Sequence, residues 1–186
     1  LLVTRSGRQG LLQEDRRDHP DDRKGDTHDV GDEEEAVETA KQYLAYFQGS
    51  ISDWEAPDQR KLRHIVPENR MRLYDMREVI KTIADVDSVL EIREKFGIGI
   101  ITAFIRVEGR PVGVIANNPH HISGAIDSDG ADKGARFIKL CDAFDIPILS
   151  LMDTPGMMVG PDVESTALVR HCVRLFNAGA NVTVPM

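Results

Sequence analysis

Three apolar runs follow one another in the second half of the chain, at 98–107, 112–116 and 146–152. Between the second and the third run, apolar residues recur at helical spacing over 131–144. A glycine-containing loop, 153–160, follows the third run and leads into another helical pattern. The order strand, strand, helix, strand, glycine loop, helix predicts an α/β domain with a largely buried sheet. Any function should lie where those strands end.

The first two runs are joined by a segment that is typical of a hairpin. Gly109 supplies the turn geometry and Pro111 fixes the start of the next strand. We therefore expect two antiparallel strands to enter the core together. Residues 88–92 form a further short candidate strand.

The two helical patterns in this half each have one apolar face. For the first helix we expect Ser128 or Asp129 as N-cap. Its packed face comprises Gly134, Phe137, Ile138, Cys141 and Phe144, and its outward side comprises Asp132, Lys133, Arg136 and Lys139. The last helix, 162–178, should bury Leu168, Cys172, Leu175 and Phe176. Residues 181–186 resemble a strand that is cut off after it has begun.

The first half of the chain has weaker patterns. Residues 1–31 are rich in charge and glycine and predict an irregular tail, with a foreign or altered start. Asp32 is expected to cap a helix that has Glu35 at the capping-box position and ends at Gly49. Its apolar stripe comprises Ala36, Val37, Ala40, Tyr43, Leu44 and Phe47. Residues 50–69 form a connector, and Asp75 is expected to cap a helix that runs to about Ala84.

Composition narrows the possible classes of protein. The chain has 186 residues, 41% of them hydrophobic, which is enough for one domain with a core or for parts of two. A net charge of −8 without a basic patch argues against nucleic-acid binding. Cys141 and Cys172 are expected to be buried thiols in a reducing compartment. No apolar run has the length of a membrane span, so we expect a cytoplasmic protein without membrane contact.

Familiar catalytic motifs are missing from the sequence: it has no nucleophile elbow, Walker loop, His-Glu-x-x-His pair or Cys-x-x-Cys pair. His120 and His121 are adjacent, and neighbouring side chains in an extended loop point in opposite directions, which disfavours a metal site. His64 and His171 are isolated. We therefore expect no metal.

The loop 153–160 has two interpretations. It lies between a buried strand and a helix N-terminus, where free backbone N–H groups can hold an oxygen anion or a polar ligand. Pro155 and Gly156 permit a sharp turn with no side chain in the way. The same residues also suit an ordinary strand-to-helix turn, and the segment 117–124 has the same ambiguity.

Taken together, several blocks of sequence resemble a known family. They are residues 109–119 (GRPVGVIANNP), 123–127 (SGAID), 132–147 (DKGARFIKLCDAFDIP) and 153–156 (DTPG) with Gly160. In this order they are similar to the carboxyltransferase component of biotin-dependent acyl-CoA carboxylases, of the propionyl-CoA carboxylase β-subunit type. The resemblance covers 54–186, and the helix at 33–47 resembles the one that closes the N-terminal domain of the family.

The resemblance implies a crotonase-like spiral of β-β-α units, here truncated, with residues 70–186 as part of the C-terminal carboxyltransferase domain. It also implies acyl-CoA as substrate, biotin on a separate carrier protein, a biotin carboxylase partner subunit and a homo-oligomer. Backbone N–H groups of oxyanion holes would stabilise the enolate of the thioester and the ureido oxyanion of biotin. In the family those glycine pairs lie upstream of Leu1 and beyond 181–186, so we expect this chain alone to be inactive.

The resemblance also identifies the residues of the candidate site. Those expected on the biotin side of the cleft, through their backbone, are Pro155, Gly156, Met157, Met158 and Gly160. Asn118, Ser123 and Gly124 are expected to support them. Met157 and Met158 could equally fill the core. Two other classes stay open, a non-catalytic scaffold of the same fold and a crotonase-type hydratase or decarboxylase, and an acidic pair over the thioester would favour the latter.

Overall fold

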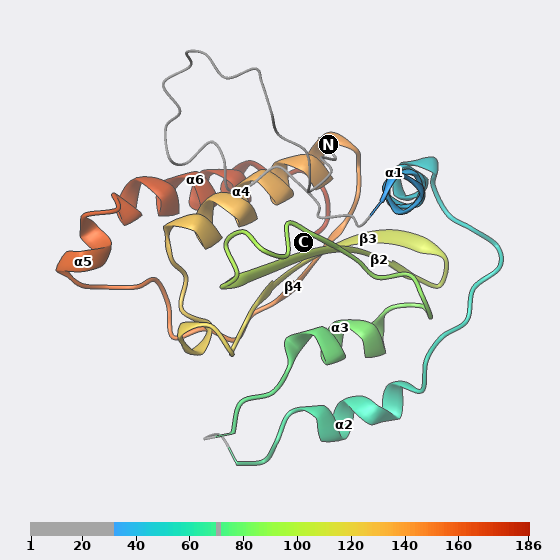
Figure 1. Ribbon diagram of the computed structural model, residues 1–186, viewed down its shortest axis with the longest axis horizontal. Coiled ribbons are helices and arrows are strands. Elements are labelled where there is room, and N and C mark those ends of the chain that lie inside the picture. The colour runs from blue at the N-terminus through green and yellow to red at the C-terminus, as the bar shows by residue number, and fades with distance from the viewer. Residues whose placement is uncertain (1–31, 70–71) are drawn as a thin grey trace.

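A four-stranded mixed sheet lies at the centre of the computed structural model, which describes residues 32–69 and 72–186 (Figure 1). The strands follow one another in sequence order, and their bounds are β1 Leu90–Ile92, β2 Ile100–Val107, β3 Arg110–Asn117 and β4 Ile148–Leu151. The first two pairings are antiparallel, whereas β3 and β4 run parallel. Because Ala116 lies opposite Leu151, the carboxyl ends of β3 and β4 meet at the same edge of the sheet.

The hairpin between β2 and β3 is confirmed. Glu108 and Gly109 both have positive φ, 51° and 74°, as a two-residue turn that follows the strand twist requires. The carboxylate of Asp85 accepts hydrogen bonds from both turn amides, at 3.0 Å from Glu108 N and 2.7 Å from Gly109 N. The short strand expected at 88–92 is also present, as β1.

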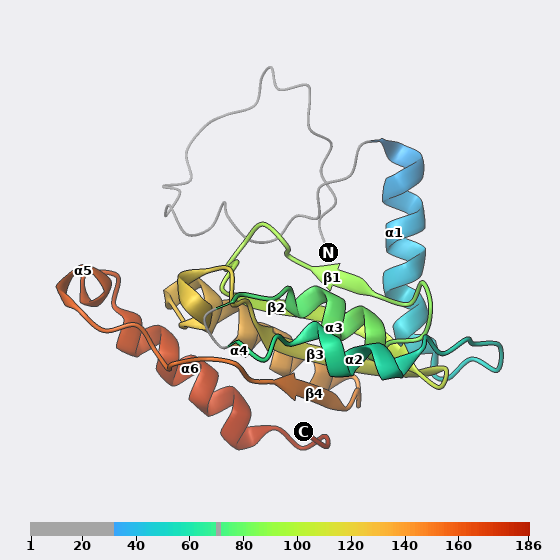
Figure 2. The same ribbon diagram turned by 90° about the horizontal axis from the view of Figure 1, so that it is seen from below.

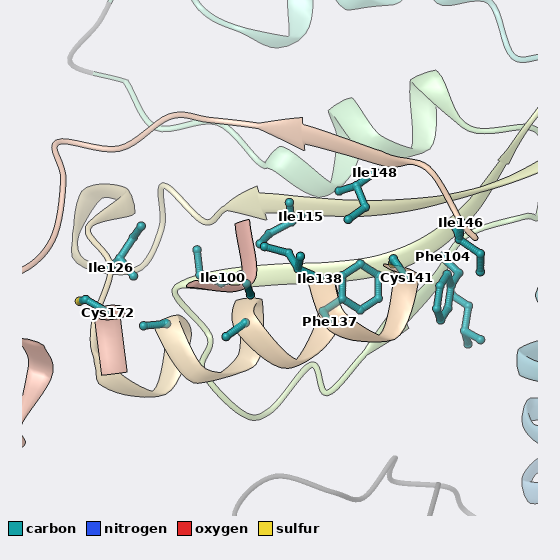
Figure 3. Packing of buried hydrophobic residues seen from close by; sticks show 14 of the residues in the cluster. Ile100, Phe104, Ile115, Ile126, Phe137, Ile138, Cys141, Ile146, Ile148 and Cys172 are labelled. Carbon is teal, nitrogen blue, oxygen red and sulfur yellow. The ribbon is translucent and has the colours of Figure 1, made fainter. Parts of the chain in front are cut away.

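Helices cover both faces of the sheet (Figure 1). The face with Ile100, Phe104 and Ile115 packs against α4, Ser128–Ala143, and α6, Leu168–Asn181, lies beside α4. The opposite face packs against α3, Met76–Ile83, which Figure 2 shows in front of the sheet. Figure 3 shows Phe104 of β2 beside Phe137 of α4, with ring centroids 5.2 Å apart. Alternate strand residues thus build two separate apolar layers.

Helix α4 differs from the prediction at its start and on one face. Asp127, rather than Ser128 or Asp129, is the N-cap, and its carboxylate accepts from Gly130 N at 2.7 Å. Lys133 was expected to face solvent but is only 1% exposed, whereas Phe144 was expected to be buried and is 55% exposed. The buried arc of α4 is wide because the sheet and α6 both cover it.

The single helix predicted over 162–178 is wrong. Residues Pro161–Glu164 form a short helix, α5, and α6 begins only after Ala167, whose φ of 57° breaks the helical path. The hydroxyl of Thr166 lies 2.7 Å from that of Ser128, which ties this break to the start of α4. Phe176 was expected inside and is 59% exposed. Residues 181–186 form no strand beyond the end of α6, although Ile148 N donates to Pro185 O.

Helix α1, Glu33–Ala45, stands beside the sheet (Figure 2). Its predicted cap is confirmed, since Asp32 accepts from Glu35 N at 2.9 Å, and Gly49 ends it with φ of 88° after a 3₁₀ turn, Tyr46–Gln48. The predicted stripe is wrong in part, because Val37 and Leu44 are exposed while Tyr46 is buried. The helix is held at its end, where the ring of Tyr46 stacks on that of Phe104 with centroids 5.4 Å apart.

One guanidinium joins this helix to the sheet. Arg106 of β2 is 6% exposed and donates to the carbonyl oxygens of Ala45 at 2.8 Å, Gly49 at 2.9 Å and Gly109 at 2.7 Å. Two of its acceptors lie at the end of α1 and the 3₁₀ turn that follows it, and the third lies in the β2–β3 turn. The buried charge is therefore satisfied by backbone dipoles rather than by a carboxylate.

Two short helical segments lie in the connector between α1 and α3. The connector contains a 3₁₀ turn, Gln59–Lys61, and a one-turn helix α2, Leu62–Ile65, and the predicted cap of α3 is confirmed, since Asp75 accepts from Arg77 N. The tail predicted for 1–31 lies outside the described residues. Among the described residues, no helix is long and apolar enough to cross a membrane.

Candidate functional site

Two loops meet beyond the carboxyl ends of β3 and β4. The first, 118–127, links β3 to α4, and the second, 152–160, links β4 to α5. Figure 1 shows both at the end of the sheet from which the chain runs on to α5. Ligand sites of α/β sheets lie at this edge, because adjacent parallel strands deliver their following loops to one place.

The two loops are joined by backbone hydrogen bonds. Ile126 N donates to Gly156 O and Met158 N donates to Ile126 O, both at 3.0 Å, which makes a one-residue parallel bridge between Ile126 and Met157. At Gly124, a Cβ atom would lie 2.3 Å from the carbonyl oxygen of Asp153. Only glycine permits this approach, so the site depends on Gly124 for the fit of one loop against the other.

The loop after β4 is also braced internally. Thr154 Oγ1 accepts from Gly156 N at 3.0 Å and lies 3.2 Å from Gly156 O, to which it can donate. Gly156 has φ of 126°, a conformation that side chains disfavour, and nothing lies within 4 Å of the position that a Cβ would occupy. The chain therefore turns at Gly156 through a backbone conformation that favours glycine, and no other group occupies the space where a side chain would lie.

The residues that the sequence placed on the biotin side divide into two groups. Pro155 is exposed, a Cβ at Gly156 would have nothing within 4 Å, and a Cβ at Gly160 would meet only Val163 Cγ2 at 3.9 Å. Met157 and Met158 are half-buried and pack against the core, and Cys172 Sγ lies 3.2 Å from Met157 Sδ. The side chains of Met157 and Met158 thus attach the loop to the apolar core.

Backbone donors remain available on the same loop. Within the described ranges, the amides of Met157, Val159 and Gly160 donate to no protein acceptor. Val159 is 87% exposed, so this part of the loop meets solvent. Such amides can bind an oxygen atom of a ligand without any catalytic side chain.

The three residues predicted to support the loop have different surroundings. Asn118 Nδ2 donates to Ile98 O at 2.9 Å, and its Oδ1 accepts from His120 N at 3.1 Å, so this side chain shapes the first loop. Ser123 is exposed and left-handed, with φ of 52°. Gly124 lies against the second loop, as described above.

Sequence reasoning missed the roles of Asn117 and Tyr74. Asn117 is fully buried and its Nδ2 donates to Gly124 O at 3.0 Å. The hydroxyl of Tyr74 donates to Asp153 Oδ2 at 2.6 Å. Desolvation of Tyr74, assisted by the Asp153 carboxylate, raises the pKa of its hydroxyl to about 12. The role of Asn117 could have been suspected, because a polar residue at the end of a buried strand needs a partner. The contact of Tyr74 with Asp153 joins residues 79 positions apart, so no local sequence pattern indicates it.

Two histidines have carboxylate partners, and both cysteines are free thiols. His120 is exposed, while His121 Nε2 lies 3.1 Å from Asp127 Oδ2, and His171 Nδ1 lies 2.9 Å from Asp132 Oδ2. The part of the chain that the structure describes holds no group of three or more His, Cys, Asp or Glu residues placed to bind a metal. Both cysteines are buried free thiols, as expected, and burial raises the pKa of Cys141 to about 12.

Comparison with known proteins shows the family to which the chain belongs. Residues 23–186 match the family described as the carboxyl transferase domain, so the chain belongs to that family. The resemblance drawn from the sequence is confirmed. The crotonase-like α/β fold class is confirmed as well, because the solved carboxyltransferase structures match most of this chain, which is a mixed α/β fold with a four-stranded sheet.

Particular relatives follow from the same comparison. The chain is 46% identical over 122 residues to the propionyl-CoA carboxylase β chain of Roseobacter denitrificans, which covers 66% of this chain and 24% of the relative. It is 39% identical over 162 residues to the uncharacterized carboxylase YngE of Bacillus subtilis, covering 82% and 32%. The chain thus spans a third or less of these relatives.

Solved structures agree with these relatives. A single-chain, multi-domain long-chain acyl-CoA carboxylase superimposes with a TM-score of 0.83 at 54% identity, over 87% of this chain and 16% of that one. The transcarboxylase 12S subunit, solved as a hexamer and core of a multienzyme complex, gives a TM-score of 0.76 at 34% identity, over 84% and 32%.

Proposed function

We propose that this chain is the part of an acyl-CoA carboxylase carboxyltransferase that forms the biotin side of the cleft. The observation that supports it is the bridged pair of loops at the ends of β3 and β4, with an open backbone at Gly156 and free amides at Met157, Val159 and Gly160. Acyl-CoA is the substrate, and biotin arrives on a separate carrier protein. The proposal includes a homo-oligomer in the cytoplasm and a biotin carboxylase partner.

The reaction needs charge stabilisation more than side-chain acids or bases. In this reaction the N1–carboxyl bond of carboxybiotin would break and release CO2, the α-carbon of the thioester would pass its proton to N1 of the biotin left behind, and the α-carbon would then form the new carbon–carbon bond to CO2. Negative charge develops on the ureido oxygen of biotin as the bond breaks. Backbone amides held rigidly beside that oxygen lower the barrier, because they need no reorganisation during the reaction.

A hydratase or decarboxylase of the same fold is less well supported. Such chemistry needs carboxylates that are free to transfer protons over the thioester. Asp127 is occupied by Gly130 N and His121, and Asp153 by Tyr74. The two carboxylates nearest to the loops are thus committed to structure.

A chimera of this chain with a longer relative tests the proposed function. The segment of the Roseobacter denitrificans β chain that matches this chain is replaced by the residues of this chain, and carboxylation of propionyl-CoA is measured with the biotin carboxylase partner. We expect biotin-dependent turnover from the chimera and none from the isolated chain with free carboxybiotin. A chimera that assembles but transfers no carboxyl group would favour the non-catalytic scaffold.

A pair of glycine variants makes this test specific to the loop. In the chimera, Gly156→Val should lower turnover at least tenfold, because φ of 126° excludes a β-branched side chain. Gly179→Ala is the matched control, since Gly179 lies exposed in α6 with nothing within 4 Å of its Cβ position. Equal activity of the two variants would refute the assignment of this loop to the site.

A further inference from the structure

The loop after β4 has a contact with the opposite layer of the molecule. Tyr74 lies just before α3, which covers the face of the sheet away from α4. Its hydroxyl donates to Asp153 Oδ2 at 2.6 Å across 79 residues of sequence. Because the acceptor is a carboxylate, this hydrogen bond belongs to the stronger, charge-assisted kind.

Asp153 is the point at which the loop leaves the sheet. Its carbonyl oxygen packs against Gly124 of the neighbouring loop, and its carboxylate accepts from Tyr74. Three residues further on, Gly156 O accepts from Ile126 N. The loop is thus supported from the α4 side by Gly124 and Ile126 and from the α3 side by Tyr74.

We propose that Tyr74 is a positioning residue, whose hydroxyl holds Asp153 and thereby fixes the loop 153–160 for its ligand. The proposal rests on the proposed function, because it treats that loop as the biotin-side wall. Tyr74 touches no reacting atom in this account. Its hydroxyl acts through the Asp153 carboxylate on the amides of Gly156 to Gly160.

The role of the Tyr74 hydroxyl can be tested separately from that of the Tyr74 ring. The ring of Tyr74 packs against the apolar layer on the α3 side, so Tyr74→Phe keeps this packing and removes only the hydrogen bond. Tyr43→Phe is the matched control. Tyr43 packs edge-to-face on Phe47 and Phe104, far along the chain from the loop.

Amide hydrogen exchange of the 186-residue chain tests the positioning directly. Tyr74→Phe should speed exchange of the Gly156 and Met158 amides about tenfold or more, as expected for the loss of a hydrogen bond to a charged group. Asp153→Ala should have a similar effect, and the double variant should add nothing further. Tyr43→Phe should leave these amides unchanged. Unchanged exchange in Tyr74→Phe, or additive effects of the two variants, would overturn the proposal.

Biotin methyl ester, titrated against the same chain by NMR, tests the consequence for the ligand. Tyr74→Phe should weaken its binding several-fold and Tyr43→Phe should not. Wild-type affinity in Tyr74→Phe, together with faster loop exchange, would show that the hydrogen bond does not position the loop for its ligand and would overturn the proposal. Absence of binding to the wild-type chain would instead count against the proposed function, while the exchange data still decide whether Tyr74 fixes the loop.

Discussion

Lys133 is a buried cation without a hydrogen-bond acceptor among the described residues. Its side chain is 1% exposed on the inner side of α4. The pKa of its amine is lowered from 10.5 to about 8, mainly by desolvation; Arg77 and Arg93 contribute to the lowering, and Glu91 and Glu94 partly oppose it. The folded protein therefore holds a proton on Lys133 less tightly than the unfolded chain does.

This difference predicts a dependence of stability on pH. Below pH 8 the amine is charged in both states, and the cost of burying it is fully present. Between pH 8 and 10.5 the folded state has lost the proton that the unfolded state still binds, so the free energy of unfolding rises, by up to about 3 kcal/mol for this group.

Lys133→Met isolates the effect from that of Cys141, which titrates in the same range. At pH 7 the variant should be about 2–3 kcal/mol more stable than the wild type, and the gain should shrink toward pH 10.5. Urea unfolding at several pH values measures it. Lys139→Met, at an exposed position of the same helix, should change stability little. A destabilised Lys133→Met variant at pH 7 would contradict the argument.

Two glycines of the site predict different costs of adding a methyl group. Gly156→Ala meets no neighbour, so its cost is backbone strain of about 1–2 kcal/mol. Gly124→Ala has φ of 83° and also drives its Cβ to 2.3 Å from Asp153 O, so it should cost at least about 1 kcal/mol more. Thermal or urea unfolding compares the two, and equal stabilities would rule out the close fit between the loops.

Helices show which interactions are local. The caps of α1 and α3, at Asp32 and Asp75, could be predicted because a cap and its N–H partner lie within three residues. The break between α5 and α6 was not predicted, and the contact found there, between Thr166 and Ser128, joins residues 38 positions apart in the sequence. The same holds for Phe176, whose helical spacing fits the packed face although the observed α6 leaves it outside.

The start of α4 allows a direct test of the corrected cap. Asp127→Ala should lower the free energy of unfolding by about 1–2 kcal/mol, because Gly130 N loses its acceptor and His121 loses its partner. Ser128→Ala, at the position predicted from the sequence, should cost less, since its hydroxyl bonds only to Thr166 at the surface. A larger loss for Ser128→Ala would contradict the assignment of Asp127.

For the whole molecule, the order of helices and strands could be predicted from the sequence. The contacts between elements that are far apart in the sequence could not. The hairpin at Gly109 and the strand preceding the glycine loop follow from apolar runs and turn residues. Burial of Lys133 and the contact of Tyr74 with Asp153 depend on how α4 and α3 pack on the sheet. The position of the candidate loop after β4 could therefore be predicted from the sequence, but the side chains that hold this loop could not.

The surface of the folded chain predicts association. The edges of the sheet are β1 and β4, and α6 exposes Val169, Val173 and Phe176 at helical spacing. Light scattering should show mass rising with concentration, and Phe176→Lys should reduce it. Asn177→Lys, which adds the same charge at a polar exposed position, should have less effect. A wild-type chain that stays monomeric at high concentration would contradict this.

The guanidinium of Arg106 gives α1 a mechanical connection to the sheet. Three carbonyl groups from the end of α1, from Gly49 and from the β2–β3 turn converge on this one side chain, at the end of the sheet remote from the two loops. Any displacement of α1 would therefore act first on this hairpin, and it would have to pass along the eight residues of β2 and of β3 to reach the two loops.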